Sequence, residues 1–486
     1  MPVNTFYQAA TDHLSLGNAF YERVEPAAFP ELRLRYRNNS AAKTVGLDDL
    51  DDDEWLAHFG RFDALPDNIS APVALKYHGH QFRHYNPDIG DGRGFLFAQL
   101  REGGDTAGRL LDLATKGSGQ TPYSRDGDGR LTLKGGVREV LATELLEARG
   151  VYTSRSFSLI ETGERLFRND EPSPTRSAVL VRLGHSHVRF GTFQRLAVRR
   201  ETQELQDLIT YSIDRYWPNA ASEPDPVAAF FRSVTQAVGQ QAAEWFAAGF
   251  VHGVLNTDNT VITGESFDYG PWRFLPTFEP GFTAAYFDQT GLYAFARQPG
   301  ALHWNLQRLA DCLLPFSNEA ALVDALQSFG PAFETRLSQM TRARLGLATP
   351  DEKTAGDDPL VQSFYGALGA SKIGWEQTFH DLFGGAPLAR VLNSPNASAF
   401  SEEPWSEAID QIRCAELHPA AAAALASTAF NTPRPIDLLI DDVEAIWSGI
   451  AADDDWTAFE RALTQCRAYG DALKPIRPPR MNPKLS

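Results

Sequence analysis

The feature that most constrains the fold is a strongly apolar helix that leads straight into a polar loop. Residues 226–249 repeat apolar side chains at the 3.6-residue spacing of an α-helix, and Pro226 stands at the start, where a helix accepts proline. The apolar face comprises Val227, Phe230, Phe231, Val234, Val238, Ala242, Trp245 and Phe246. Because such a helix is anchored in the core, we expect the loop that begins at His252 to be held rigidly, as a functional loop must be.

That loop reads HGVLNTDN from His252, and FDYG follows shortly after it. Protein kinases bind Mg²⁺ through the Asn of an H-R-D-x-x-x-x-N loop and the Asp of a D-F-G motif. If His252 matches the His of that loop, Asn259 matches the metal-binding Asn and Asp268 the Asp of D-F-G. Val254 then replaces the catalytic Asp, and Asp258 lies beside the metal-binding Asn. The alternative is a plain turn, since short polar side chains hydrogen-bond their own backbone.

A glycine-rich segment, GDGRG at residues 90–94, precedes a predicted strand over residues 95–100. Glycines such as Gly90 and Gly92 let backbone N–H groups approach an anion closely, and Arg93 adds a fork of donors. This arrangement is typical of a phosphate-covering loop, although a simple hairpin turn has the same composition. The three histidines nearby, at 78, 80 and 84, match no metal-ligand spacing.

A lysine and a glutamate follow in the order found in kinases. Residues 109–116 alternate with a period of two, which predicts a strand that ends at Lys116. Residues 137–149 form a predicted helix with Glu139 in its first turns. In kinases a Lys–Glu pair between strand and helix directs the lysine toward the phosphates. A solvated lysine is the alternative, and Glu144 and Glu147 are expected to face water.

Further basic and polar groups stand at the same end of the chain. The glycine-rich segment 117–136 contains Asp128-Gly129, with Arg125 and Arg130 beside them, and is either a solvent loop or a nucleotide contact. Arg182, on a predicted strand, and Arg189 are either ion-pair partners or a phosphate clamp. Residues 193–216 and most of the chain after residue 304 are predicted to be helical.

Composition narrows the class of protein. The formal net charge of −17 argues against a nucleic-acid backbone as the main partner, while a few local cations still suit a nucleotide. The three cysteines, Cys312, Cys414 and Cys466, form neither a disulfide framework nor a zinc pattern. The first residues carry no secretory signal and no apolar stretch is long enough for a membrane span, so we expect a cytoplasmic protein without a membrane partner.

Taken together, these motifs resemble the SelO (selenoprotein O, or YdiU) family of protein adenylyltransferases, which have a pseudokinase fold. The matching stretches are GHQF near residue 80, GDGRG at 90–94, TKGSGQTPYSRDGDGRLTLKGGVREVL at 115–141, SHVRFGTFQ at 186–194, and NTDN with FDYGP at 256–271. The resemblance is clear over residues 10–345 and weaker afterwards.

The resemblance implies an α+β, kinase-like bilobal fold with a helical C-terminal extension. It predicts four parts: an N-terminal extension over residues 1–75, an N-lobe over 76–185, a C-lobe over 186–345 and a helical region over 346–486. It also implies transfer of AMP from ATP to Ser, Thr or Tyr hydroxyls of proteins, the protein itself included, with release of pyrophosphate. UMP transfer is an additional activity to consider, and the alternatives are a γ-phosphoryl-transferring kinase and an inactive ATP-binding scaffold.

The resemblance also assigns site residues. Asp258 would be the proton acceptor, Asn259 and Asp268 would hold Mg²⁺ or Mn²⁺, and Lys116 would pair with Glu139. The residues that would bind ATP are Gly90, Gly92, Arg93, Lys116, Asp128, Gly129, Arg182, Arg189 and Asp268. Many members carry a cysteine where this chain has Thr283-Ala284-Ala285, and another near the C-terminus, so a redox switch of that type is not expected here.

Overall fold

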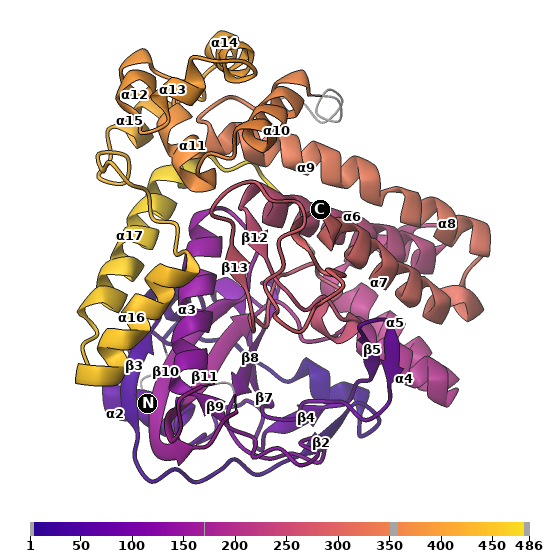
Figure 1. Ribbon diagram of the computed structural model, residues 1–486. Helices are drawn as coiled ribbons and strands as arrows, with labels where there is room; N and C mark the ends of the chain where they lie inside the picture. Colours follow the sequence, from indigo (N-terminus) through magenta and orange to yellow (C-terminus); the bar gives the residue numbers. More distant parts are fainter. Residues whose placement is uncertain (1–3, 170, 350–357, 481–486) are drawn as a thin grey trace.

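The computed structural model describes residues 4–169, 171–349 and 358–480, which form an α+β structure (Figure 1). An antiparallel sheet occupies the N-terminal part, and helices make up most of the chain after residue 186. Residues 1–3, 170, 350–357 and 481–486 belong to the four predicted parts but lie outside the described residues. The boundaries of those parts stay predictions.

The main sheet has the strand order β2-β4-β7-β8-β11-β10-β3, with β1 added beside β7 and β9 beside β11. Every pairing in it is antiparallel. The strands are β1 (Ala9–Ala10), β2 (Tyr21–Arg23), β3 (Arg33–Arg37), β4 (Val73–Leu75), β7 (Leu96–Arg101), β8 (Leu110–Lys116), β9 (Leu131–Thr132), β10 (Arg155–Leu166) and β11 (Thr175–Gly184). The strands predicted before and at Lys116 are therefore confirmed.

One helix, α3 (Leu133–Ala148), packs against β10 and β11. It begins earlier than predicted because Thr132 caps it, accepting a hydrogen bond from the backbone N–H of Gly135. The sequence Gly135-Gly136 had favoured a loop over these residues. Shorter N-terminal elements are α1 (Asn39–Thr44), α2 (Asp52–Phe59) and the hairpin of β5 (Gly79–Gln81) with β6 (His84–Asn86).

The central helix α6 (Pro226–Ala247) is buried along its length, as predicted, and Asp225 caps its first turn. It packs on α7 (Gln298–Leu313), α8 (Glu319–Gln327) and α9 (Phe329–Arg344). Residues 193–216 are helical, as predicted, except at a break that was not predicted. Two helices, α4 (Phe190–Arg199) and α5 (Thr202–Tyr216), are separated at Arg200, whose φ of 59° lies in the left-handed region and ends α4.

The C-terminal helices divide between two places (Figure 1). The first group packs in an apolar cluster that also includes Val251, Leu275 and Phe295. Its helices are α10 (Pro359–Ser371), α11 (Trp375–Leu382), α12 (Leu388–Asn393), α13 (Ala397–Phe400) and α14 (Trp405–Cys414), followed by α15 (Ala421–Leu425). The second group, α16 (Ile440–Asp453) and α17 (Thr457–Leu473), returns to pack on α3. No helix in the described part of the chain is long and apolar enough to cross a bilayer.

The return of α17 overturns one expectation about α3. Glu144 was expected to face water, but it is buried, accepts a hydrogen bond from Tyr36 (2.5 Å) and pairs with Arg467 of α17 (2.9 Å). The apolar spacing of α3 alone gave no sign of a helix that arrives more than 300 residues later. Glu147 is exposed, as expected.

Candidate functional site

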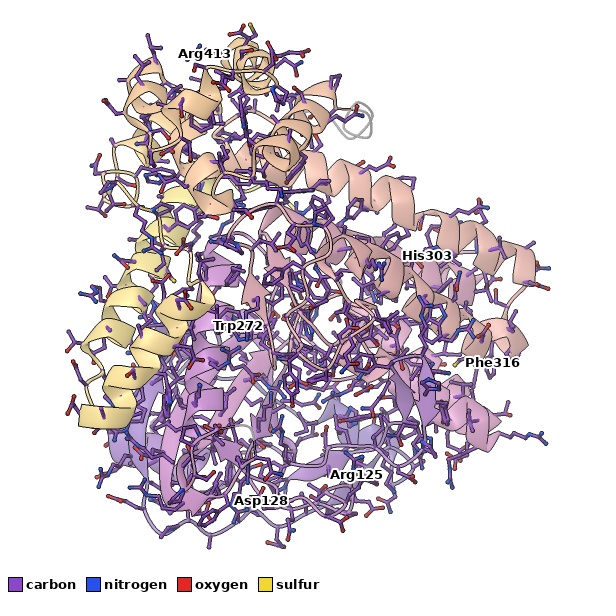
Figure 2. The ribbon with its side chains drawn as sticks, in the orientation of Figure 1. Arg125, Asp128, Trp272, His303, Phe316 and Arg413 are labelled. Carbon is purple, nitrogen blue, oxygen red and sulfur yellow. The ribbon has the colours of Figure 1, made fainter. Side chains whose placement is uncertain are left out.

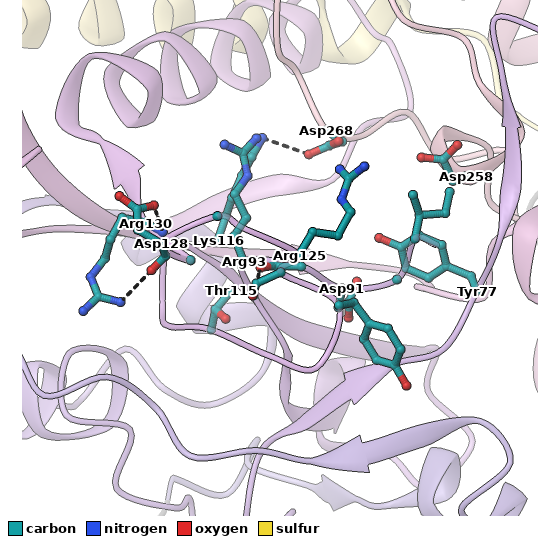
Figure 3. A pocket seen from close by; sticks show the side chains of 18 of the residues that line it. Tyr77, Asp91, Arg93, Thr115, Lys116, Arg125, Asp128, Arg130, Asp258 and Asp268 are labelled. Atoms are coloured by element: carbon teal, nitrogen blue, oxygen red, sulfur yellow. Dashed lines mark hydrogen bonds and ion pairs between the residues drawn. The ribbon is translucent and has the colours of Figure 1, made fainter. Parts of the chain in front are cut away.

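A cavity of about 640 Å³ lies between the glycine-rich loop, the end of β8 and the segment after it (Figure 3). The residues predicted to bind nucleotide meet there. Those that line it are Gly90, Gly92, Arg93, Lys116, Asp128, Gly129, Arg182, Arg189 and Asp268, together with Asp258. They come from segments far apart in sequence, so the fold builds one polar chamber from them.

The glycine-rich loop packs tightly on the segment that follows β8. A Cβ atom on Gly90 would lie 2.5 Å from the Tyr123 ring, so any larger side chain would push the two segments apart. Two side chains tie the segments together: Thr121 donates to the carbonyl of Asp91 and Ser124 to that of Gly92, each at 2.5 Å. The segment 117–130, left open by the sequence, therefore forms part of the cavity wall.

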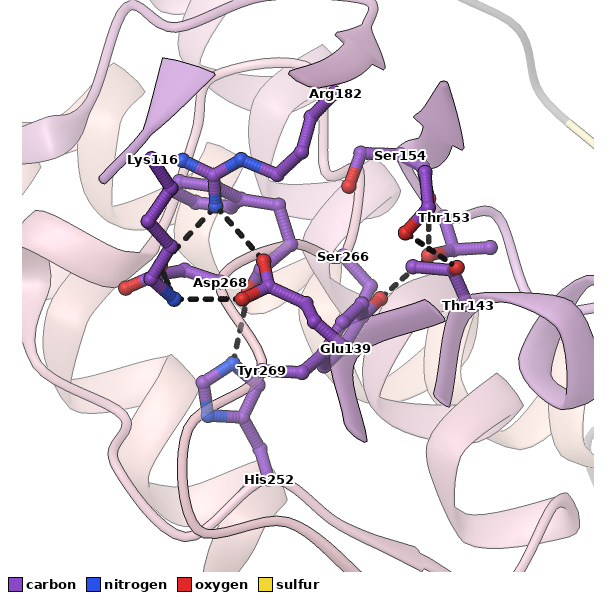
Figure 4. A network of polar contacts seen from close by, with 12 residues as sticks. Lys116, Glu139, Thr143, Thr153, Ser154, Arg182, His252, Ser266, Asp268 and Tyr269 are labelled. Carbon is purple, nitrogen blue, oxygen red and sulfur yellow. Dashed lines mark hydrogen bonds and ion pairs between the residues drawn. The ribbon is translucent and has the colours of Figure 1, made fainter. Parts of the chain in front are cut away.

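Deep in the site, two cations and two carboxylates form one network (Figure 4). Lys116 Nζ lies 2.7 Å from Glu139 and 2.8 Å from Asp268. Arg182 Nη1 lies 3.2 Å from Glu139 and 3.1 Å from the same oxygen of Asp268. Lys116 and Arg182 hold the pKa of Asp268 well below its usual value despite its burial, so this carboxylate stays ionised.

The backbone at Asp268 is also constrained. Its φ of 63° is left-handed, which costs a non-glycine residue of the order of 1 kcal/mol. The buried His252 ring lies 2.9 Å from the carbonyl oxygen of Phe267, immediately before Asp268. Strand β12 (Phe250–Val251), just before His252, pairs with β13 (Arg273–Phe274), just after the Asp268 turn. This pairing fixes the loop and the turn relative to each other.

Asp258 occupies a different wall, in a short 3₁₀ turn over Thr257–Asn259. Its side chain is 7% exposed, and its Oδ1 atom has no hydrogen-bond partner among the described residues. Arg189 donates to the backbone carbonyl of Asp258 (2.9 Å) and pairs with Asp91 (3.2 Å), so it does not contact that oxygen. Burial raises the pKa of Asp258 to about 6.

Asn259, which was predicted to ligate the metal with Asp268, is not among the residues that line the cavity. Its side-chain nitrogen donates to the carbonyl of Val254 (3.1 Å). That bond leaves the amide oxygen as the atom able to ligate a cation. The side chains present suit Mg²⁺ or Mn²⁺, because the Asn259 amide and the Asp268 carboxylate offer the hard oxygen atoms that these ions prefer. No group of three or more His, Cys, Asp or Glu side chains within the described residues is arranged around a metal position.

The rim of the cavity is more exposed than its walls. Asp128 pairs with Arg168 (2.8 Å) and accepts from the backbone N–H of Arg130. Arg130 is itself directed to Glu164 (2.8 Å). Arg125 and Asp128 lie near one another at the edge of the molecule (Figure 2). These side chains can meet a ligand only at the mouth of the cavity.

Sequence reasoning missed three groups that shape the site. Asp91 holds Arg189, and Tyr77 lies against the Arg189 guanidinium, 4.3 Å from ring centroid to Cζ. Arg168, from the turn between β10 and β11, pairs with Asp128. Asp91 stands within the GDGRG motif and could have been proposed as a partner for an arginine. Nothing near Tyr77 or Arg168 in the sequence pointed to the site.

Comparison with known proteins gives one consistent result. The family described as "Protein adenylyltransferase SelO" matches residues 3–467. A protein of Synechocystis sp. named "Protein nucleotidyltransferase YdiU" is 42% identical over 476 residues, which cover 94% of this chain and 97% of that protein. Proteins of the same name from Gloeobacter violaceus and Vibrio cholerae are 43% and 38% identical; they are matched over 93% and 76% of this chain and over 93% and 73% of their own lengths.

The family match extends beyond the stretch in which the resemblance is clear from motifs. It continues past residue 345, where the resemblance is weaker, through the C-terminal helices to residue 467. Those helices are held by apolar packing, which many side chains can satisfy, so they contain few short motifs that can be recognised by eye.

Proposed function

The chain belongs to the SelO family of protein adenylyltransferases, and on that premise we propose that it transfers AMP from ATP to Ser, Thr or Tyr hydroxyls of proteins. The observation that carries this proposal is the carboxylate of Asp258. It is buried, its Oδ1 atom has no partner in the described part of the chain, and it faces a cavity whose other wall is cationic. We also propose that the fold is kinase-like, with the cavity between a sheet-containing N-lobe and a helical C-lobe.

In the proposed reaction, Lys116, Arg182 and Arg189 offset the negative charge of the triphosphate, and the glycine-rich loop covers it. Asp258 accepts the proton of an incoming hydroxyl group. The hydroxyl oxygen forms a bond to the α-phosphorus while the bond from that phosphorus to the bridging oxygen breaks, and pyrophosphate leaves with the electron pair. Val254 has no group that could accept a proton, which favours Asp258 in this role.

Asn259 and Asp268 would hold a Mg²⁺ or Mn²⁺ ion. When bound, such an ion neutralises phosphate charge and orients the triphosphate. Lys116 and Arg182 both contact the Asp268 carboxylate, so we expect metal binding to rearrange this ion-pair network. Glu139 would retain Lys116 and Arg182 in place during that change.

Labelled ATP tests the proposal against its rivals. The purified protein is incubated with Mg²⁺ or Mn²⁺ and either α-³²P-ATP or γ-³²P-ATP, alone and with lysate proteins. AMP transfer leaves the α label on protein, including on the chain itself, and a mass shift of one AMP. A kinase would leave the γ label, and an inactive scaffold would leave neither. Parallel incubation with labelled UTP separates AMP transfer from UMP transfer.

A further inference from the structure

A second polar cavity, of about 300 Å³, lies at the opposite end of β8 from Lys116. Arg109, which immediately precedes β8, is one of its lining residues. Seven residues of extended strand separate Arg109 from Lys116, a distance of about 23 Å. The two cavities share no lining residue. This second cavity is therefore separate from the proposed nucleotide site.

Arginines dominate the lining of the second cavity. They are Arg109, Arg155, Arg336, Arg477 and Arg480. Two glutamates each form ion pairs with two of these arginines. Glu102 lies 2.6 Å from Arg109 and 3.9 Å from Arg155. Glu244 lies 2.9 Å from Arg336 and 3.0 Å from Arg480.

Arg477 and Arg480 each have an N–H donor without a hydrogen-bond partner among the described residues. Arg477 Nη2 donates to the backbone carbonyls of Ala148 and Gly470, which carry no full charge. Arg477 Nε and Arg480 Nη1 are buried and have no hydrogen-bond partner among the described residues. Burial lowers the pKa of Arg477, even though the carboxylates of Glu147 and Asp471 act in the opposite direction.

The carboxylates in the lining do not make up the deficit. Glu147 is exposed, so its charge is screened by water. Glu265 is buried and accepts a hydrogen bond from the backbone N–H of His185 (2.8 Å). Burial raises the pKa of Glu265 to about 7, although Arg109, Arg155 and Arg480 act in the opposite direction. Even with Glu265 ionised, the five arginines face four carboxylates (Glu102, Glu147, Glu244 and Glu265), so the cavity retains positive charge and unused donors.

We propose that this cavity binds a phosphate-type oxyanion between Arg155, on β10, and Arg477 and Arg480, in the segment after α17. A guanidinium presents two parallel N–H donors, which match two oxygens of a tetrahedral oxyanion. Such an anion would compensate the buried guanidinium charge and satisfy the unused donors of Arg477 and Arg480. This inference does not depend on the AMP-transfer reaction.

Backbone hydrogen bonds connect the wall of this cavity to the segment that carries Asp268. The backbone N–H of Ser266 donates to the carbonyl of Tyr152, and the N–H of Ser154 donates to the carbonyl of Ser266, each at 2.9 Å. Tyr152 and Thr153 line the cavity, and Ser266 stands two residues before Asp268. An anion that orders the 152–155 segment would therefore order the start of the Asp268 turn.

Isothermal titration calorimetry with inorganic phosphate at constant ionic strength tests the proposal. The cavity variant is Arg155→Gln/Arg477→Gln. The matched control is Arg93→Gln/Arg125→Gln, which removes the same number of guanidiniums from the nucleotide cavity. We expect phosphate to bind the wild type and the control with the same affinity, and the cavity variant at least roughly tenfold more weakly, because that variant loses two guanidiniums that donate charge-assisted hydrogen bonds.

Two results would overturn the proposal: phosphate binding that disappears in the Arg93→Gln/Arg125→Gln control, or binding by the cavity variant that equals the wild type. If the cavity variant does not fold, Arg155→Lys/Arg477→Lys replaces it, because lysine keeps the charge and loses the fork. Weaker binding is again expected, and unchanged affinity would count against the site. A parallel titration with AMP distinguishes free phosphate from the phosphate group of a larger molecule.

Discussion

Two carboxylates that line the same cavity differ in the direction in which their pKa values are shifted. Asp268 keeps a pKa well below its usual value, whereas the pKa of Asp258 rises to about 6. Asp258 is buried and the Asp268 side chain is 26% exposed, and both lie in the same chamber (Figure 3). Burial raises the pKa of a carboxyl group in both places, so burial cannot explain the difference.

The difference lies in which atoms the neighbouring cations touch. Lys116 and Arg182 both contact the carboxylate of Asp268 directly (Figure 4). Arg189 instead donates to the backbone carbonyl of Asp258 and forms an ion pair with Asp91. A cation that contacts the backbone lowers the pKa of the neighbouring carboxyl group less than one that contacts the carboxylate itself.

This contrast favours two separate roles. A carboxylate that stays ionised over the whole physiological range suits a permanent cation ligand. A carboxylate with a pKa near 6 suits proton transfer, because it is ionised at neutral pH and is still a better proton acceptor than an ordinary aspartate. Substitutions at Asp258 and Asp268 should therefore affect different properties, proton transfer for the first and metal-dependent binding for the second.

The largest effect is expected at Asp258. Asp258→Asn keeps the shape of the side chain and removes the proton acceptor, so AMP transfer should fall roughly 10²–10⁴-fold. ATP binding should be retained, because the cationic wall is unchanged. Transfer is measured with α-³²P-ATP and binding by calorimetry, with Asp88→Asn as the control, an exposed carboxylate outside the cavity lining. Transfer within a few-fold of the wild type would show that Asp258 is not the base.

Asp268→Asn should act on binding rather than on proton transfer. It removes one charge of the proposed metal ligand, so the metal-dependent part of nucleotide affinity should fall roughly 10–100-fold. Asn259→Ala should change affinity in the same direction. Calorimetric titration of ATP with Mn²⁺ and with EDTA measures this part directly. If the metal dependence of ATP affinity were unchanged in both variants, Asp268 and Asn259 would not be metal ligands, and Asp258 and Asp268 would not have the two roles proposed.

The sequence predicted the part of the site around Lys116 and Glu139 better than the part around Asp258. Lys116 and Glu139 could be placed because a strand of period two and a helix of period 3.6 both have strong signals. The structure brings the two side chains to 2.7 Å. The raised pKa of Asp258 could not have been predicted, because it depends on the direction in which Arg189, 69 residues away in sequence, points its donors.

The same limit explains where fold predictions were wrong. Apolar spacing identified α6 and α3, but whether Glu144 faces water is decided by α17. The left-handed turn at Arg200 that separates α4 from α5 leaves the apolar spacing on both sides intact. Local patterns predict elements; contacts between distant elements decide which polar groups become buried, and those contacts are not visible in a single stretch of sequence.

The raised pKa of Asp258 also predicts a pH effect on stability. The folded protein binds this proton up to about pH 6, whereas an unfolded aspartate releases it near 3.8. The free energy of unfolding should therefore fall as pH rises from about 4 to 6. Asp258→Asn should gain about 3 kcal/mol over the wild type at pH 7, and only about 0.5 kcal/mol at pH 4.

Urea unfolding of both proteins at pH 4 and pH 7, in EDTA, measures this difference. In the wild type, AMP transfer should also decline tenfold per pH unit below about pH 6, as the acceptor becomes protonated. A variant that is no more stable than the wild type at pH 7 would mean that Asp258 is better solvated or better paired than the described contacts indicate, and that the two walls do not differ.

The smallest effect is expected at the rim. Asp128 is 47% exposed and pairs with Arg168 at the mouth of the cavity, where an ion pair contributes at most about 1 kcal/mol. Asp128→Asn should therefore change the KM for ATP by less than roughly fivefold and leave kcat unchanged, and Arg168→Gln should do the same. Steady-state kinetics of both variants measure this. A loss comparable to that of Asp268→Asn would mean that nucleotide binding depends on the rim as much as on the ion-pair wall, because an exposed contact gains such weight only when a ligand excludes water from it.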